Sequence, residues 1–404
     1  MQVRPILATL NHHKLTTLLL MLQVAFTCAI VCNVVFMIAQ RVALTSAPSG
    51  VAENELAMIE NFDLQESGDL IARHTADLAA LRAIPGVKAA AAVDALPFNG
   101  NDWGNGIATV AQGPSRLVAT AFDGSPGELD ALGLHLLAGR DFLPEEYISV
   151  DSAHGYAGID HVPAAIVTRA LAERLFPGQS PLGKPIYPGN SPARIVGVVD
   201  HLQRPSVSTG GDNEYSTLFP MRLDTRDVEY VLRTGPGQRQ RALRDAAAVL
   251  DRLDGNRILR NPQTFEQLRA DYFRRDRTMI GLLIASALGL LFVTALGITG
   301  LASFWVQQRT RTIGVRRALG ATRGDILTYF QTENFLIVTF GIVPGTILAV
   351  AINLTLMKFY ELPHLPFFYL PIGALALWML GQLAVLHPAL RAAAVPPVVA
   401  TRTV

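Results

Sequence analysis

One segment of the chain nearly matches the phosphate-binding loop of nucleotide hydrolases, G-x-x-x-x-G-K-[ST]. It begins at Gly178 and reaches Gly183 and Lys184, but the next residue is Pro185. The motif requires a hydroxyl there to bind magnesium, and proline also lacks the backbone N–H that would contact phosphate. We therefore interpret this segment as a turn that binds no nucleotide.

Other signatures of catalysis or metal binding are missing from the sequence. None of the patterns H-E-x-x-H, C-x-x-C or G-x-S-x-G occurs. Four aspartates lie near loop signals and are interpreted as solvated or capping groups: Asp94, Asp102, Asp123 and Asp130. We expect no catalytic residue, no cofactor-binding residue and no metal-binding residue. Any ATP hydrolysis that drives this protein would then occur in another chain.

A basic segment in the last third of the chain carries the strongest functional signal. It reads Arg309-Thr-Arg-Thr-Ile-Gly-Val-Arg-Arg-Ala-Leu-Gly-Ala-Thr-Arg-Gly-Asp-Ile-Leu. The pattern predicts a short amphipathic helix that ends at a glycine, followed by a second helix. Such a helix could lie on anionic membrane lipid, or it could dock onto a partner protein. The candidate docking residues are Arg309, Arg311, Ile313, Gly314, Arg316, Arg317, Leu319, Gly320, Arg323 and Asp325.

Four long apolar runs position this segment. A bilayer-spanning helix needs about 20 mostly apolar residues. We predict transmembrane helices at residues 15–41, 278–306, 328–357 and 370–387. The remaining segments are 1–14, 42–277, 307–327, 358–369 and 388–404. The net charge of +1 and the absence of a long basic run argue against a nucleic-acid partner.

The distribution of lysine and arginine predicts how the chain crosses the membrane. Arg4 and Lys14 precede the first span, and Arg391 and Arg402 follow the last. Five arginines lie in segment 307–327, whereas the short loop 358–369 carries a single lysine. Short basic segments stay in the cytoplasm. Both termini are therefore expected inside, and segment 42–277 and the loop 358–369 outside.

Small and polar residues mark specific places within the predicted spans. The pairs Gly341/Gly345 and Ala285/Gly289 are small-xxx-small patterns, which let helices approach closely either within one subunit or between subunits. Gln331 and Glu333 lie at the cytoplasmic mouth of the third span. A carboxylate there is costly unless it is paired, so we expect Glu333 to pair with a basic residue of the preceding segment.

Strands and helices alternate in segment 42–277, which predicts an α+β domain. Strand candidates are residues 87–93, 106–110, 116–122, 164–168, 193–199 and 228–232. Helix candidates are residues 63–83, 126–132, 169–176, 238–253 and 265–277, the last running directly into the second span. The expected fold class is an α-helical membrane protein with four transmembrane helices and a large α+β domain inserted between helices one and two.

The basic segment also carries a family resemblance. The run I-G-V-R-R-A-L-G-A-T-R-x-D-I-L that begins at Ile313, followed by Gln331-x-Glu333, resembles the permeases of the MacB/FtsX family of ABC transporters. The end of the chain, from His387, resembles the closing P-A-x-R-A-A-x-x-P-P-x-x-A-L-R signature of that family. Further matches to the family's periplasmic core domain are Ser125-Pro-Gly, Leu132-Gly-Leu, Gly139-Arg-Asp-Phe, the Phe176–Lys184 run and Ile195-Val-Gly-Val-Val.

This resemblance implies a multi-pass permease subunit in the bacterial inner membrane, with segment 42–277 as a MacB-like periplasmic core domain. It implies a second permease subunit, in a homodimer or heterodimer, and a cytoplasmic ABC ATPase in a separate chain that binds ATP and magnesium. Segment 307–327 would transmit closure of the ATPase, and segments 1–14 and 388–404 would be cytoplasmic. Relatives in tripartite efflux pumps also use a periplasmic adaptor and an outer-membrane duct.

Two functions are compatible with the resemblance. The first is export, in which ATPase-driven movement of the periplasmic domains expels a drug, peptide, lipid or lipoprotein. The alternative is a regulatory or sensory protein that transmits the ATPase state to a periplasmic hydrolase or peptide-sensing partner without transport. Thr312 departs from the family, which often has an acidic residue at that position. If that acid pairs with the ATPase, this subunit would couple weakly or depend on a second, different permease.

Overall fold

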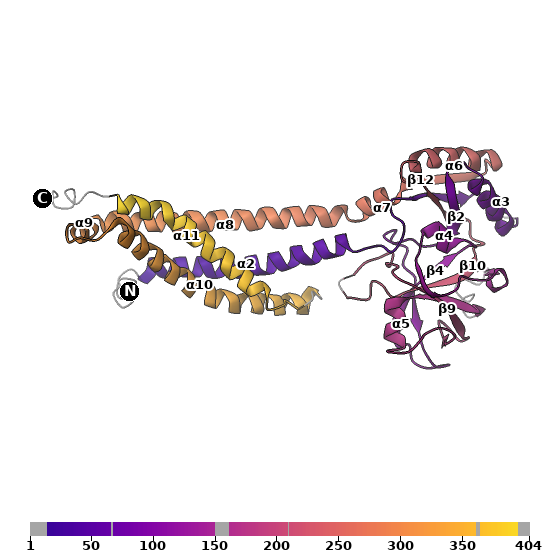
Figure 1. The fold of residues 1–404 in the computed structure, drawn as a ribbon, viewed down its shortest axis with the longest axis horizontal. Coiled ribbons are helices and arrows are strands. Elements are labelled where there is room, and N and C mark those ends of the chain that lie inside the picture. Colours follow the sequence, from indigo (N-terminus) through magenta and orange to yellow (C-terminus); the bar gives the residue numbers. More distant parts are fainter. Residues whose placement is uncertain (1–13, 66–67, 150–160, 209, 361–363, 395–404) are drawn as a thin grey trace. The chain divides into compact units, whose positions relative to one another are not determined.

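The computed structural model describes residues 14–65, 68–149, 161–208, 210–360 and 364–394 (Figure 1). Most of the predicted segments 1–14 and 388–404 lies outside these residues. The chain divides into two compact units. The helical unit contains the residues up to Thr45 and those from Asp276 onward, and the outer unit is Ser46–Arg275.

The helical unit consists of α2 (Lys14–Ser46), α8 (Arg274–Gln308), α9 (Thr310–Ala318), α10 (Arg323–Tyr360) and α11 (Tyr369–Ala393). Among the described residues, four of these helices are long and apolar enough to cross a membrane: α2, α8, α10 and α11. They correspond to the four apolar helices that the sequence predicts. However, α2 extends beyond residue 41, and α10 begins before residue 328.

Polar contacts join the long helices to one another. The hydroxyls of Thr27 on α2 and Thr294 on α8 lie 2.8 Å apart, and the Asn33 amide donates to the Ala349 carbonyl of α10 at 3.0 Å. Arg41 and Asp276 form an ion pair between α2 and α8. A polar group left unsatisfied in lipid costs several kcal/mol, so these pairings favour one arrangement of the helices.

The outer unit is built on a mixed β-sheet. Its strands are β1 (Leu56–Asp63), β2 (Val87–Val93), β3 (Gly104–Ile107), β4 (Leu117–Gly124), β5 (Leu136–Gly139), β6 (Ile148–Ser149), β7 (Ala164–Thr168), β8 (Pro185–Ile186), β9 (Ala193–Val199), β10 (Ser216–Arg222), β11 (Asp227–Thr234) and β12 (Arg257–Thr264). The order along the sheet is β12-β1-β11-β2-β4-β10-β7-β9-β5, and β3, β6 and β8 pair with β4, β10 and β9. Along this path, β4 and β10 pair in parallel, as do β7 and β9, whereas the neighbouring pairs are antiparallel.

Helices cover both faces of this sheet. They are α3 (Leu70–Arg82), α4 (Glu128–Leu132), α5 (Arg169–Leu175), α6 (Arg239–Leu253) and α7 (Phe265–Tyr272). Side chains of β1 alternate between two cores, as strand geometry requires. Leu56 and Met58 belong to the cluster that contains residues of α4, whereas Ile59 belongs to the cluster that contains residues of α3 and α6.

The predicted secondary structure of the outer domain is confirmed in part. The strands predicted at 87–93, 164–168 and 193–199 are present with those bounds, but β1, β5, β6, β8, β10 and β12 were not predicted. Pro220 and Pro262 lie inside β10 and β12, and proline in a run argues against a strand. The helix predicted from residue 63 begins at Leu70, because the Asp69 carboxylate accepts from the Ala72 N–H at 2.9 Å and caps it.

The single helix predicted over 265–277 is wrong. α7 ends at Tyr272 and α8 begins at Arg274, with Phe273 between them at φ −88° and ψ 9°. The Phe273 side chain is buried in the outer unit, and its ring centroid lies 5.0 Å from that of Phe98. The chain therefore turns at Phe273, where the ring is buried, and does not continue as one uninterrupted helix.

Candidate functional site

The predicted amphipathic helix is α9, and local interactions define both of its ends. Arg309, between α8 and α9, is outside helical geometry at φ −102° and ψ 9°. Gly320, at φ +101°, follows the helix in the left-handed conformation that glycine adopts most readily. The Thr322 hydroxyl accepts from the Asp325 N–H, and the Asp325 carboxylate accepts from the Thr322 N–H, which forms a capping box at the start of α10. The glycine stop and the second helix that follows it confirm the sequence prediction.

One face of α9 is buried and the other is exposed. Ile313 and Gly314 are buried, and Ile313 shares a hydrophobic cluster with Ile326 and Phe330 of α10. On the opposite side, Leu319 is 83% exposed and Val315 is 47% exposed. An exposed leucine of this kind has no packing role in the described part of the chain and is available to a partner.

Arg309 anchors the turn between α8 and α9. Its guanidinium donates to both oxygens of Glu333 on α10, at 3.0 and 2.9 Å, and the Glu333 side chain is only 2% exposed. The guanidinium also lies 5.8 Å from the centroid of the Trp305 ring. The expected partner of Glu333 in the basic segment is thus Arg309, and this arginine is directed inward.

The remaining arginines of the segment differ in their surroundings. Arg317 donates to the carbonyl of Ala393 on α11 at 3.1 Å, so it also contacts the helical unit. Arg311, Arg316 and Arg323 are exposed. Arg316 lies over the Tyr329 ring, 5.0 Å from its centroid, and Arg316 and Thr312 line an open pocket of about 200 Å³. Among the candidate docking residues, Arg309 and Arg317 thus each make a contact within the helical unit.

The two small-residue pairs behave differently. A Cβ on Gly341 would lie 2.7 Å from Val24 Cβ, and one on Gly345 would lie 2.7 Å from Cys28 Cβ, both on α2. These glycines thus permit close approach of α10 and α2 within one chain. By contrast, Gly289 has nothing within 4 Å of its would-be Cβ, and Ala285 is exposed. Gln331 accepts through its backbone carbonyl from Gln382 on α11.

The segment that resembles a phosphate-binding loop is a turn, as predicted. Gly178 and Gly183 have φ +68° and +77°, and the Lys184 N–H donates to the Pro181 carbonyl at 3.1 Å. The Lys184 ammonium donates to the Gln179 side chain, and β8 rather than a helix follows. Across the described ranges, no group of three or more histidine, cysteine, aspartate or glutamate side chains could hold a metal ion.

The sequence did not reveal the buried carboxyl groups of the outer unit. Asp123 and Glu128 were not expected in the core, yet they are 6% and 2% exposed. Burial raises the pKa of both groups well above their ordinary values. Interpreting Asp123 as a solvated or capping residue is therefore wrong, because this residue of β4 is buried in the outer unit.

Two protein-family models match this chain. A family model described as a MacB-like periplasmic core domain matches residues 15–249, which is more than half of the chain. A second model, described as the C-terminal part of FtsX-like permeases, matches residues 284–397 and includes α9. The chain belongs to the MacB/FtsX family of ABC transporter permeases. Its exposed α9 surface is therefore part of an FtsX-like permease domain.

Curated relatives of this MacB/FtsX permease are export proteins by name. The pyoverdine export ATP-binding/permease protein PvdT of Pseudomonas aeruginosa is 29% identical over 198 residues, which are 47% of this chain and 29% of that protein. The macrolide export ATP-binding/permease protein MacB of Nitrosomonas europaea is 29% identical over 251 residues, 59% of this chain and 37% of that protein. The matched region spans about a third of the length of these relatives.

Solved structures with similarity to the chain include two extracytoplasmic domains. The periplasmic region of MacB from Actinobacillus actinomycetemcomitans has a TM-score of 0.33 at 16% identity and covers 54% of this chain and 93% of its own. The extracellular domain of the transporter YknZ from Gram-positive bacteria has a TM-score of 0.32 at 21% identity, covering 50% and 100%.

Proposed function

We propose that this MacB/FtsX permease couples ATP hydrolysis by a separate cytoplasmic ABC ATPase to movement of its outer domain, and that this movement drives export. The observation that carries the proposal is α9. Its exposed residues Val315 and Arg316, and Leu319 directly after it, are available to a partner, and its buried residue Ile313 packs in the core of the helical unit. A force applied to α9 would reach the long helices through that contact.

Two further contacts support transmission from α9. Arg309 connects the start of α9 to Glu333 of α10, and Arg317 connects its end to Ala393 of α11. A surface helix that lay on lipid alone would need neither contact. The arrangement is therefore better suited to a docking helix than to an interfacial anchor.

The proposed orientation follows the distribution of basic residues. Both termini and α9 would lie in the cytoplasm, and the outer unit would lie in the periplasm of the bacterial inner membrane. The ATPase would bind ATP and magnesium, and this chain would contribute no catalytic residue. A second permease subunit would complete the transporter, and the open face of α8 at Ala285 and Gly289 is the proposed contact.

We propose a chemical class for the exported cargo. The proposed class is a drug, peptide, lipid or lipoprotein that leaves the cell. The relatives named for pyoverdine and macrolide export support export as the activity. A periplasmic adaptor and an outer-membrane duct would then complete the export path. Thr312, at an exposed position of α9, would make docking depend more on apolar contact than on an acidic group.

Affinity purification of the tagged full chain in mild detergent tests this function. We expect an ABC ATPase to co-purify, with vanadate-sensitive ATP hydrolysis in the eluate. Mass spectrometry of the same eluate would identify a second permease and any adaptor. Absence of an ATPase in several detergents would contradict the transporter function, and recovery of the ATPase with a periplasmic hydrolase and no export defect in a deletion strain would favour the regulatory alternative.

A further inference from the structure

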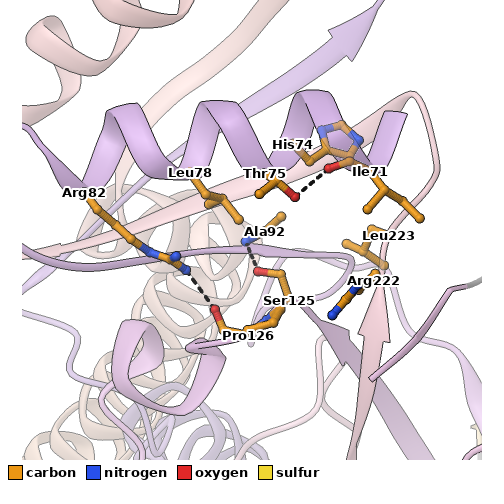
Figure 2. Close-up of a pocket in the computed structure, with 10 residues that line it drawn as sticks. All are labelled: Ile71, His74, Thr75, Leu78, Arg82, Ala92, Ser125, Pro126, Arg222 and Leu223. Atoms are coloured by element: carbon orange, nitrogen blue, oxygen red, sulfur yellow. Dashed lines mark hydrogen bonds between the residues drawn. The ribbon is translucent and has the colours of Figure 1, made fainter. Parts of the chain in front are cut away.

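A pocket in the outer unit has no role in the proposed coupling. It has a volume of about 230 Å³ and lies between α3, the loop after β4 and the end of β10 (Figure 2). Its lining residues are Ile71, His74, Thr75, Leu78, Arg82, Ala92, Ser125, Pro126, Arg222 and Leu223. We call this the α3 pocket.

The α3 pocket carries positive charge that its own lining does not neutralise. Arg82 donates to the carbonyls of Ala90 and Pro126, which hold the guanidinium in place without cancelling its charge. The Arg222 side chain is exposed, and its guanidinium makes no hydrogen bond or ion pair with another described residue. In the view of Figure 2, the two guanidinium groups lie on either side of Ser125. No carboxylate is among the lining residues.

Ser125 adds a hydrogen-bond donor to this pocket. Its hydroxyl oxygen accepts from the Ala92 N–H at 2.9 Å, and the residue is 6% exposed. Within the described ranges, no acceptor is found for the hydroxyl proton itself. Since buried hydroxyl groups normally satisfy their protons, this donor is available to an acceptor in the pocket.

The other walls of the pocket are apolar. Ile71 and Leu78 come from α3, and Leu223 follows β10. His74 also lines the pocket, but both of its ring nitrogens already have partners, the Tyr230 hydroxyl at 2.8 Å and the Thr225 carbonyl at 3.0 Å. A ligand that fits must therefore combine a negative group with a short hydrophobic one.

We propose that the α3 pocket binds a small organic carboxylate that bears a short apolar group. The guanidinium of Arg222 would hold the carboxylate, since guanidinium and carboxylate groups match in geometry. The guanidinium of Arg82, on the other side of Ser125 in Figure 2, would add positive charge to the pocket. Ser125 would donate to the same group, and Ile71, Leu78 and Leu223 would contact the apolar part. Free N-acyl amino acids and the C-terminal residue of a peptide both have this chemistry.

Isothermal titration calorimetry on the full chain in detergent tests the proposal. The first probe is N-acetyl-leucine, and N-acetyl-leucinamide is the matched probe without charge. Acetate and inorganic phosphate test whether negative charge is sufficient for binding without the apolar group. Ala-Ala-Leu with a free carboxylate, and the same peptide amidated, distinguish a peptide terminus from a free acid.

Two variants of the pocket and one control complete the test. Arg222→Met should weaken binding of the best carboxylate probe at least roughly tenfold, since a charge-assisted hydrogen bond is lost. Ile71→Ser should weaken N-acetyl-leucine binding without creating phosphate binding. Arg244→Met removes an exposed arginine on α6, outside the pocket, and should change nothing.

The outcomes are distinct from those of the ATPase experiments, because binding is measured without nucleotide. The proposal is supported if either carboxylate probe binds the parent protein, its matched amide does not, and the folded Arg222→Met variant no longer binds the carboxylate probe. Equal binding of acids and amides, phosphate binding as tight as that of N-acetyl-leucine, or no heat from any probe at about 10 mM would overturn it.

Discussion

Arg309 donates to both carboxylate oxygens of Glu333, at 3.0 and 2.9 Å, and thereby joins the turn before α9 to the interior of α10. The side chains are 17% and 2% exposed. A buried pair of this kind contributes little net stability when both partners are present, but removing one partner leaves an uncompensated charge. The pair thus fixes where α9 can lie.

We predict that Glu333→Ala lowers the free energy of unfolding of the detergent-solubilised protein by about 3 kcal/mol, because Arg309 is left buried and unpaired. The double variant Arg309→Met/Glu333→Met should recover most of this loss. Denaturant unfolding followed by circular dichroism measures both changes. A double variant less stable than the single one would contradict the pairing argument.

The pairing of Glu333 with Arg309 was predictable from the sequence only in part. A carboxylate at the mouth of a span must be paired, so its need for a basic partner was predictable from chemistry alone. Which of five nearby arginines would serve was not, since the choice depends on the non-helical turn at Arg309. The contact of Arg317 with Ala393 was not predictable either, because the two residues are far apart in the sequence.

The close packing of α10 on α2 gives a second prediction. Gly345→Leu should destabilise the helical unit by roughly 3 kcal/mol, because even a Cβ would lie 2.8 Å from the Ala25 carbonyl oxygen. Gly289→Leu has open space and should leave unfolding unchanged. Thermal unfolding in detergent measures the difference.

The same variants address the proposed second subunit. If Gly289 packs against another permease, Gly289→Leu should reduce the dimer fraction measured by light scattering, at unchanged thermal stability. An unaltered dimer fraction would remove Ala285 and Gly289 from the proposed interface and leave the intrachain role of Gly345 untouched.

A pH dependence is expected from the outer unit. Burial raises the pKa of Glu229 to about 7 from its ordinary value of 4.5. Below pH 4.5 this carboxyl is protonated in both the folded and the unfolded chain. As pH rises toward 7, the unfolded chain releases the proton first, so the folded state loses up to about 3 kcal/mol of stability.

Glu229→Gln should remove this contribution. We predict that the variant and the parent have similar stability near pH 4 and that the variant becomes progressively more stable up to pH 8. The pH dependence should be reduced rather than abolished, since burial also raises the pKa of Asp94 to about 7. A constant stability difference at all pH values would show that Glu229 ionises normally in the fold.

The fold of the outer unit was predictable where periodicity and turn signals agree. The strands at 87–93 and 193–199 are short apolar runs bounded by loop residues, and they were located correctly. β12 is an edge strand with Pro262 and mostly polar side chains, so its sequence lacks the usual strand pattern. The Phe273 break was missed because it depends on a ring packing against Phe98, far away in the sequence.

The central claim is that the exposed face of α9 transmits the action of an ABC ATPase. The most direct measurement is vanadate-sensitive ATP hydrolysis by the co-purified complex carrying Arg316→Glu and Leu319→Asp, with Arg244→Glu on α6 as the charge-matched control. We predict that stimulated hydrolysis falls at least roughly tenfold, while the thermal midpoint is unchanged and the control retains full activity. Unchanged hydrolysis in the α9 variant would contradict the claim.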